Sequence, residues 1–252
     1  MPTITDEAVV LRRWDFSETS QMVSLFTRAH GVVRGLAKGA KREKSPYSGG
    51  FEPLTRGHVA AIVKPSTELA NVIEWDLAEV FQAPRRRLEA HHAALYLADL
   101  VHHAVTDHDP HPALYERLVE SLRGLETVEH LHDAVLRFQW ALLVETGYRP
   151  MLDRDAATGR ELGAGGASLG YSPTAGGVVA EPTEQSGAGR AWRVRSDTIE
   201  LLRSLEHGPA AAGMAAAGVV TTRAAALLAL HLAVIMDRDL PTRKLLFGPI
   251  PT

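Results

Sequence analysis

Five basic residues lie close together near the start of the sequence and could bind a polyanion. They are Arg34, Lys38, Lys41, Arg42 and Lys44. The last four fall within a glycine-containing stretch, residues 38–50. Lysine and arginine neutralise phosphates and release counterions, so a solvated loop of this composition is typical of contact with a nucleic-acid backbone. The alternative is a solvated basic face that has no partner.

The charge distribution favours the nucleic-acid interpretation. Residues 8–72 hold ten Lys/Arg and five Asp/Glu, a net charge of +5, whereas the whole chain carries -3. A basic N-terminal part on an acidic remainder is typical of nucleic-acid-binding proteins. Arg12 and Arg13 are further candidates. Because adjacent side chains of a strand point to opposite faces, only one of them can face a binding groove.

Two aromatic residues follow the basic loop. Tyr47 and Phe51 could supply rings on which unpaired bases stack, an interaction worth ~1–3 kcal/mol per base. The alternative is that the rings fill the interior of the domain or anchor the loop. We include Tyr47 in the predicted DNA-binding set.

Twelve histidines raise the alternative of metal chemistry. His108-Asp109 and His132-Asp133 are dipeptides of the kind found in metal-dependent phosphohydrolases, which would require these side chains to converge on one metal ion. Histidines on an apolar helix stripe are more often hydrogen-bonded core residues, so we expect no catalytic residue. The sequence also has no phosphate-binding loop, no nucleophile elbow and no cysteine, which excludes disulfides and thiolate metal sites.

Five short apolar runs precede residue 80 and predict strands. They are Ala8–Arg12, Gln21–Thr27, Val32–Leu36, Leu54–Val63 and Leu69–Leu77. Their number and spacing favour a small β-barrel of the OB type, although periodicity does not separate it from an SH3-like barrel. We predict an α+β, multidomain protein whose first domain, 1–80, is an OB-fold nucleic-acid-binding domain.

Residues 81–252 are predicted to form an α-helical domain. Apolar residues recur at helical spacing after Pro84, after Asp109-Pro110, which resembles a helix cap and first turn, and again after residues 128, 196 and 221. The segment from about 150 to 191 departs from this pattern, because nine of the 33 residues from Gly159 to Ala191 are glycine. We expect a small irregular or hairpin-like insertion there.

Eight stretches of the sequence match one known pattern. They are Ala8–Arg13, Phe16–Ser20, Leu25–Thr27, Gly31–Ala40, Leu95–Leu100, Gly147–Pro150, Leu152–Arg154 and Leu240–Phe247. Together they resemble the RecO family of bacterial recombination mediators, over nearly the whole chain. The resemblance implies an OB-fold, a helical domain with a zinc-ribbon-like insertion, binding to single- and double-stranded DNA, and annealing of complementary strands. It also implies action with RecR in loading RecA onto DNA coated by single-strand-binding protein.

One departure from that family concerns a metal. RecO proteins often carry two Cys-x-x-Cys pairs in the insertion, and the matching positions here are Asp155, Thr158, Ala180 and Thr183. Threonine is a poor zinc ligand and alanine is none, so this chain is expected to have a degenerate ribbon that lacks its structural zinc. We therefore predict no metal and no cofactor.

Two further features bear on partners and location. Arg85-Arg86-Arg87 could contact DNA or the acidic tail of single-strand-binding protein, or could be a solvated helix face. The N-terminal residues do not resemble a signal peptide, and the apolar stretch Ala224–Met236 is shorter than the ~20 residues of a membrane span. We expect a cytoplasmic, nucleoid-associated protein. The remaining alternative is a protein scaffold whose barrel contacts only other proteins.

Overall fold

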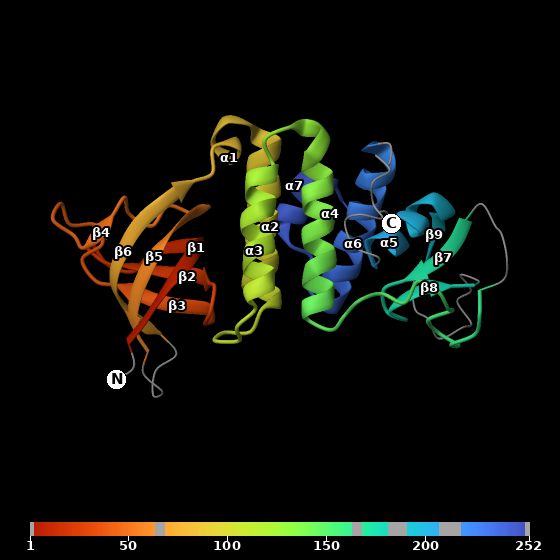
Figure 1. Ribbon diagram of the computed structural model, residues 1–252, viewed down its shortest axis with the longest axis horizontal. Coiled ribbons are helices and arrows are strands. Elements are labelled where there is room, and N and C mark those ends of the chain that lie inside the picture. Colours follow the sequence, from red (N-terminus) through yellow and green to blue (C-terminus); the bar gives the residue numbers. More distant parts are fainter. Residues whose placement is uncertain (1–2, 64–68, 163–167, 181–190, 207–217, 250–252) are drawn as a thin grey trace. The chain divides into compact units, whose positions relative to one another are not determined.

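A computed structural model describes residues 3–63, 69–162, 168–180, 191–206 and 218–249 of the chain. Its architecture is α+β, as predicted (Figure 1). The chain divides into two compact units, Met1–Glu126 and Thr127–Thr252. Each unit is described by itself.

Six strands form one sheet in the first unit. They are β1 (Thr3–Asp15), β2 (Gln21–Thr27), β3 (Gly31–Ala37), β4 (Tyr47–Ser48), β5 (Thr55–Ile62) and β6 (Ala70–Val80). Their order is β3-β2-β1-β5-β6-β4, and residues 35–37 of β3 pair in parallel with residues 70–72 of β6 to close the sheet. This strand order and closure confirm the predicted OB-type barrel, with β4 as a short addition that the sequence pattern did not indicate.

The barrel interior is filled by side chains that alternate along the strands. Trp75 is fully buried, and its ring centroid lies 5.3 Å from that of Phe51, which in turn lies 5.1 Å from that of Tyr47. Gly57 on β5 makes room for this cluster, because a Cβ there would lie 2.7 Å from the Trp75 ring and 2.4 Å from the Asp76 carbonyl oxygen. Burying rings of this size supplies ~1.5–3 kcal/mol for each side chain.

Three helices complete the first unit. They are α1 (Ala83–Arg86), α2 (Leu88–Ala104) and α3 (Pro112–Gly124). The prediction that Asp109-Pro110 starts a helix is wrong: α3 is capped by His111 and begins at Pro112. The preceding residues pair with β3 instead, since Asp107 bridges Val32 and the His108 N–H donates to the Val32 carbonyl at 3.0 Å.

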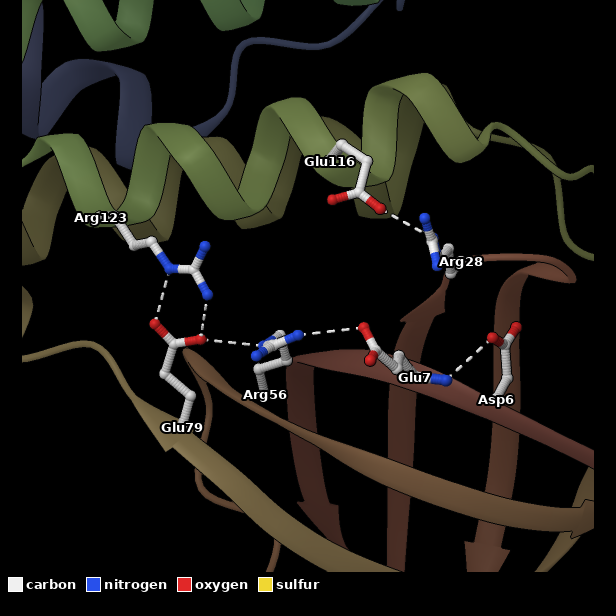
Figure 2. Close-up of polar contacts among 7 residues, drawn as sticks. All are labelled: Asp6, Glu7, Arg28, Arg56, Glu79, Glu116 and Arg123. Carbon is white, nitrogen blue, oxygen red and sulfur yellow. Dashed lines mark hydrogen bonds and ion pairs between the residues drawn. The ribbon is translucent and has the colours of Figure 1, made fainter.

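Polar contacts join α3 to the barrel strands around one aromatic contact. The rings of Phe26 on β2 and Tyr115 on α3 lie 5.8 Å apart. Four ion pairs lie nearby; three of them form a continuous chain and the pair of Arg28 with Glu116 is separate, as Figure 2 shows. The pairs are Arg28–Glu116, Glu7–Arg56, Arg56–Glu79 and Glu79–Arg123. The first unit is therefore more than a barrel, because α3 is attached to it by both apolar and charged contacts.

The second unit combines helices with a small sheet. Its elements are α4 (Val128–Glu145), β7 (Ser168–Ser172), β8 (Gly177–Val179), β9 (Trp192–Arg195), α5 (Ser196–Glu206), α6 (Gly218–Ile235) and α7 (Pro241–Phe247). The three strands form a sheet of order β8-β7-β9; β7 and β8 lie within the predicted glycine-rich insertion, and β9 follows directly after it. The C-terminal stretch, which carried no helix prediction, contains the short helix α7.

Helix α6 is apolar all round and is half-buried within the second unit. By length and composition alone it could cross a membrane, but half of it is covered by protein, as in the core helix of a folded unit. Its His231 is buried and its Nδ1 lies 3.1 Å from the Tyr171 hydroxyl of β7. This contact ties the small sheet to the helices.

Candidate nucleic-acid interface

Of the four exposed cations in the loop between β3 and β5, three form no ion pair with the described residues. They are Lys38, Arg42 and Lys44. The loop turns sharply at Gly39, which has a φ of 75°, and the Arg42 N–H donates to the Gly39 carbonyl at 3.0 Å. Within the described parts of the chain, no carboxylate forms an ion pair with any of the three. Their charges therefore face solvent, where phosphates could bind them.

Lys41 differs from its neighbours because it attaches the loop to the turn between β1 and β2. Its backbone N–H donates to the Thr19 carbonyl at 3.0 Å, and its Nζ lies 2.8 Å from an Asp15 carboxylate oxygen. The bond from Lys41 lowers the pKa of Asp15 below its ordinary value. Exposed pairs of this kind are worth only ~0–1 kcal/mol, so a phosphate could compete for Lys41.

Two arginines on the strands form ion pairs with partly exposed carboxylates. Arg13 on β1 lies 3.6 Å from Glu52, and Arg34 on β3 lies 3.0 Å from Asp107. The side chains of both arginines remain more than a third exposed. Both can therefore reach an anion without loss of a buried contact.

Arg12 points toward α2. Its guanidinium donates to one Asp99 oxygen at 2.6 and 3.1 Å and lies 3.4 Å from His103 Nε2. A β-bulge between Val10 and Arg12 shifts the register of β1 against β2 at this point. Arg12 therefore holds a helix against the barrel, whereas Arg13 is the member of the pair that stays available.

Tyr47 is a core residue and not an exposed stacking group, contrary to our expectation. It is only 6% exposed, and its hydroxyl donates to the Val72 carbonyl at 2.8 Å. Phe51, at 1% exposed, is buried beside it. Both rings pack into the barrel because the loop returns to the sheet through β4, which pairs with residues 75–76 of β6.

Sequence reasoning overlooked two other aromatic side chains. Trp14 is 40% exposed near the end of β1, and Phe16 is 57% exposed in the turn that follows. Lys41 contacts this same turn. The signal in the sequence was the position of both rings directly after Arg12-Arg13 and before the polar turn Ser17–Ser20.

A serine and a histidine lie together between β2 and α2, but their burial argues against catalysis. Ser24 Oγ and His102 Nδ1 are 3.0 Å apart, and Ser24 is fully buried. Burial lowers the pKa of His102 to about 4. The arrangement fits a polar contact within the core. Across the described ranges, no three His, Cys, Asp or Glu side chains are grouped so that they could hold a metal ion.

A pocket of about 690 Å³ lies beside α1 and the start of α2. Leu54, Phe81 and Leu95 are among its apolar lining residues, and the arginines 85–87 line it as well. Arg87 donates to the Glu126 carbonyl at 2.7 Å, whereas Arg85 and Arg86 are exposed. The pocket thus combines an apolar lining with two accessible positive charges.

The positions that match the family's cysteines lie in the second unit. Asp155 is buried, and its carboxylate accepts backbone N–H bonds from Ala157, Thr158 and Ala180. Thr183 lies outside the described residues. Alanine offers no ligand, and both oxygens of Asp155 already accept hydrogen bonds, so this donor set does not fit a tetrahedral zinc ion.

Comparison with known proteins identifies the family. Models described as "Recombination protein O N terminal" and "Recombination protein O C terminal" match residues 1–81 and 85–237. The "DNA repair protein RecO" of Rhodopirellula baltica is 32% identical over 205 residues, which are 80% of this chain and 74% of that protein. The "DNA repair protein RecO" of Anaeromyxobacter sp. is 29% identical over 245 residues, or 96% of this chain and 95% of the relative. That of Myxococcus xanthus is 31% identical over 208 residues, 82% and 83% of the two chains. The chain therefore belongs to the RecO family of DNA repair proteins.

Proposed function

We propose that this protein binds single-stranded and double-stranded DNA through its barrel and acts as a recombination mediator, not as an enzyme. In this role it anneals complementary strands and, with RecR, helps to load RecA onto DNA coated by single-strand-binding protein. The observation that carries the proposal is the exposed set Lys38, Arg42 and Lys44, which has no carboxylate partner in the described residues. Family membership supports the same role.

The proposed contacts differ in strength along the barrel. We assign the main phosphate contacts to Lys38, Arg42 and Lys44, and additional contacts to Arg13, Arg34 and Lys41, whose partners are at least partly exposed. Arg12 is assigned to positioning α2. An exposed, multiply charged loop suits a mediator, because binding must be tight at low salt and independent of base sequence.

Annealing without nucleotide tests the role. Complementary oligonucleotides should anneal faster with the protein than without it, and no ATP should be needed. Replacing Lys38, Arg42 and Lys44 by Glu should abolish the acceleration and flatten the log–log salt dependence of single-strand binding by roughly 2, at ~0.7 for each lost phosphate contact.

A matched control carries the same charge change elsewhere. Arg160, Arg193 and Arg238 are exposed arginines of the second unit, and their replacement by Glu should leave annealing near that of the unmodified protein. Equal losses in the two variants would assign the effect to net charge. No acceleration by the unmodified protein at low salt would refute the mediator role and favour a scaffold that contacts only proteins.

For the partner protein we assign the pocket beside α1. The acidic tail of single-strand-binding protein would place its carboxylates on Arg85 and Arg86 and an apolar side chain on the lining of Leu54, Phe81 and Leu95. Arg85→Glu with Arg86→Glu should weaken binding of a tail peptide more than binding of an oligonucleotide.

We further propose a cytoplasmic, nucleoid-associated location and a functional boundary near residue 80.

A further inference from the structure

An exposed aromatic ring lies beside the basic loop, in the turn between β1 and β2. Phe16 is 57% exposed, and the turn that holds it is ordered by bonds from the Phe16 and Ser17 N–H groups to the Ser20 carbonyl, at 3.1 and 3.2 Å. A large apolar ring in water gains free energy when another flat apolar surface covers it. The ring is thus a candidate contact for a ligand.

Lys41 links this ring to the cations of the loop. It donates to Thr19 through its backbone, and its Nζ contacts the Asp15 carboxylate and the Ser17 carbonyl. The turn that carries Phe16 and the loop that carries Arg42 and Lys44 are therefore held together. A ligand that places a negative group on the loop can therefore place a flat, apolar group on the Phe16 ring.

We propose that Phe16 is a base-stacking residue for single-stranded nucleic acid. This proposal rests on the DNA binding proposed above. An unpaired strand presents phosphates and flat bases at regular spacing, which matches a cation-rich loop with a ring beside it. A duplex hides the faces of its bases, so Phe16 should contribute little to duplex binding. Trp14 is less suited to this role, because its ring is 5.9 Å from that of His102 and is partly covered.

Three variants test the stacking residue. Phe16→Ala should lower affinity for an oligothymidylate by roughly 5- to 100-fold, the range expected from one lost stack. Its salt slope and its duplex affinity should stay unchanged, because the ring carries no charge. Phe16→Trp should keep affinity, and its added fluorescence should be quenched by the oligonucleotide. Leu245→Ala, at an exposed apolar residue of α7, is the control and should bind normally.

Two outcomes would overturn the assignment, and they are distinguishable. If the unmodified protein binds oligothymidylate but Phe16→Ala binds within twofold of it, stacking by Phe16 is refuted and DNA binding stands. If the unmodified protein binds no oligonucleotide, both the stacking residue and the proposed function fail. Circular dichroism of Phe16→Ala checks that the exposed turn leaves the fold intact.

A second, independent observation concerns Asp155 in the second unit. One carboxylate oxygen accepts N–H bonds from Ala157 and Thr158 at 2.9 and 2.8 Å, and the other accepts the Ala180 N–H at 2.7 Å. The first two bonds close a turn around residues 155–158, and the third reaches the chain after β8. Asp155 is only 6% exposed, and these bonds, with the one from Ala180 largest, lower its pKa.

The bonded positions coincide with those of the missing cysteine pairs. By the resemblance described above, Asp155, Thr158 and Ala180 stand at three of the four positions that hold cysteine in the family. In such a ribbon, zinc would join the turn at 155–158 to the segment after β8, and no zinc ligand set remains here. The backbone also joins these parts, since the Ala156 N–H donates to the Val178 carbonyl at 2.7 Å.

The geometry points to the Asp155 carboxylate as a metal-free replacement for the structural zinc, holding both halves of the ribbon through backbone N–H groups. A carboxylate suits this role because charged acceptors form short, strong hydrogen bonds and can accept several at once. A single aspartate substitution at the first ligand position thus supplies the cross-link that the sulfurs and the metal would otherwise supply.

Amide hydrogen exchange tests this replacement at the bonded groups. Asp155→Ala should lower protection of the Ala157, Thr158 and Ala180 N–H groups by about 10- to 100-fold, the factor expected for a bond to a charged acceptor. Asp155→Asn keeps one acceptor oxygen, so at least one of these three N–H groups should lose its protection from exchange. Asp153→Asn, at a neighbouring exposed aspartate, should leave all three protected.

Metal analysis completes the test. Protein purified without a His tag should contain no stoichiometric zinc, and a chelator should leave the three N–H groups protected. Stoichiometric zinc, or protection lost on chelation, would overturn the replacement. Unchanged protection in Asp155→Ala would overturn it as well. If Asp155→Ala does not fold, the amide protection measured in Asp155→Asn decides between these outcomes.

Discussion

The guanidinium of Arg12 is held between β1 and α2 by Asp99, whose side chain is only 10% exposed. Hydrogen bonds to a charged partner at such a site contribute ~1–3 kcal/mol. We therefore expect Arg12→Gln to lower the free energy of unfolding by about this amount and to leave the salt slope of DNA binding unchanged. Urea unfolding and oligonucleotide titrations at several salt concentrations measure both effects.

Arg13 is the matched control for Arg12. Its partner Glu52 lies 3.6 Å away and is half exposed, so Arg13→Gln should change stability by less than ~1 kcal/mol. Loss of a phosphate contact should instead flatten the salt slope by ~0.7. The reverse result, in which Arg12 changes the slope and Arg13 changes stability, would contradict these assignments.

At residue level, charge could be predicted from the sequence but partners could not. The alternation of side chains along a strand indicated that only one of Arg12 and Arg13 faces a groove. It could not show which one, because neither the bulge at Leu11 nor the pairing of Arg12 with Asp99, 87 positions away, leaves a pattern in the local sequence. Tyr47 was misjudged, and Phe16 was overlooked, for the same reason. Exposure of a ring depends on where distant strands pass, and here β4 returns Tyr47 to the barrel.

At the scale of elements, Glu79 joins β6 to α3. It accepts two bonds from Arg123, at 2.8 and 2.7 Å, and one from Arg56 at 2.9 Å (Figure 2). The bonds from Arg123 contribute most to the lowered pKa of Glu79. Glu79→Gln should weaken contacts to both arginines and lower the free energy of unfolding by ~1–3 kcal/mol. Chemical denaturation measures this loss.

A surface pair on the same helix gives the control for Glu79. Arg117 and Glu120 lie 2.8 Å apart and are both exposed, so Arg117→Gln should cost less than ~1 kcal/mol. A loss as large as that of Glu79→Gln would indicate a general effect of charge on α3. A Glu79→Gln variant as stable as the unmodified protein would show that apolar packing alone, as between Phe26 and Tyr115, attaches the helix.

The elements themselves were largely predictable, because strands and helices leave periodic patterns. The exceptions have physical causes. The start of α3 was placed too early because Asp107 and His108 pair with β3, where Gly31 leaves room for the Asp109 backbone. The insertion was expected only to be irregular or hairpin-like, because its glycines suppress the alternation of apolar residues that would mark individual strands. Its cross-link through Asp155 has no sequence signature beyond the changed cysteine position.

For the whole molecule, each compact unit contains, among its described residues, a buried histidine whose pKa is strongly lowered. Burial lowers the pKa of His102 in the first unit and of His231 in the second, in each case to about 4. In the unfolded chain a histidine titrates near pH 6.5. Both units therefore share a sensitivity to acid that does not depend on their carboxylates.

The sign of this sensitivity follows from proton binding. Between pH 6.5 and 4 the unfolded chain binds protons at His102 and His231 that the folded protein excludes, so the free energy of unfolding falls as pH falls. A pKa difference of this size corresponds to a loss of up to ~3 kcal/mol per histidine. Aspartates with lowered pKa values, such as Asp155, lose their contribution only below the ordinary pKa of 3.8. Glu79, whose pKa is also lowered, loses its contribution below its ordinary value of 4.5, so the window above that pH belongs to the histidines.

Urea unfolding at pH 7.5, 6, 5 and 4.5 measures the effect, and single substitutions assign it to a unit. His102→Gln should flatten the pH dependence of the first unit, and His231→Gln that of the second, since each glutamine keeps a polar group without a proton to gain. His58→Gln, at an exposed position of β5, should change neither. Burial also lowers the pKa of His132 in the second unit, so a small pH dependence that His132→Gln removes should remain in the double variant His102→Gln, His231→Gln. A pH dependence as large as that of the unmodified protein would show that other groups cause the acid sensitivity.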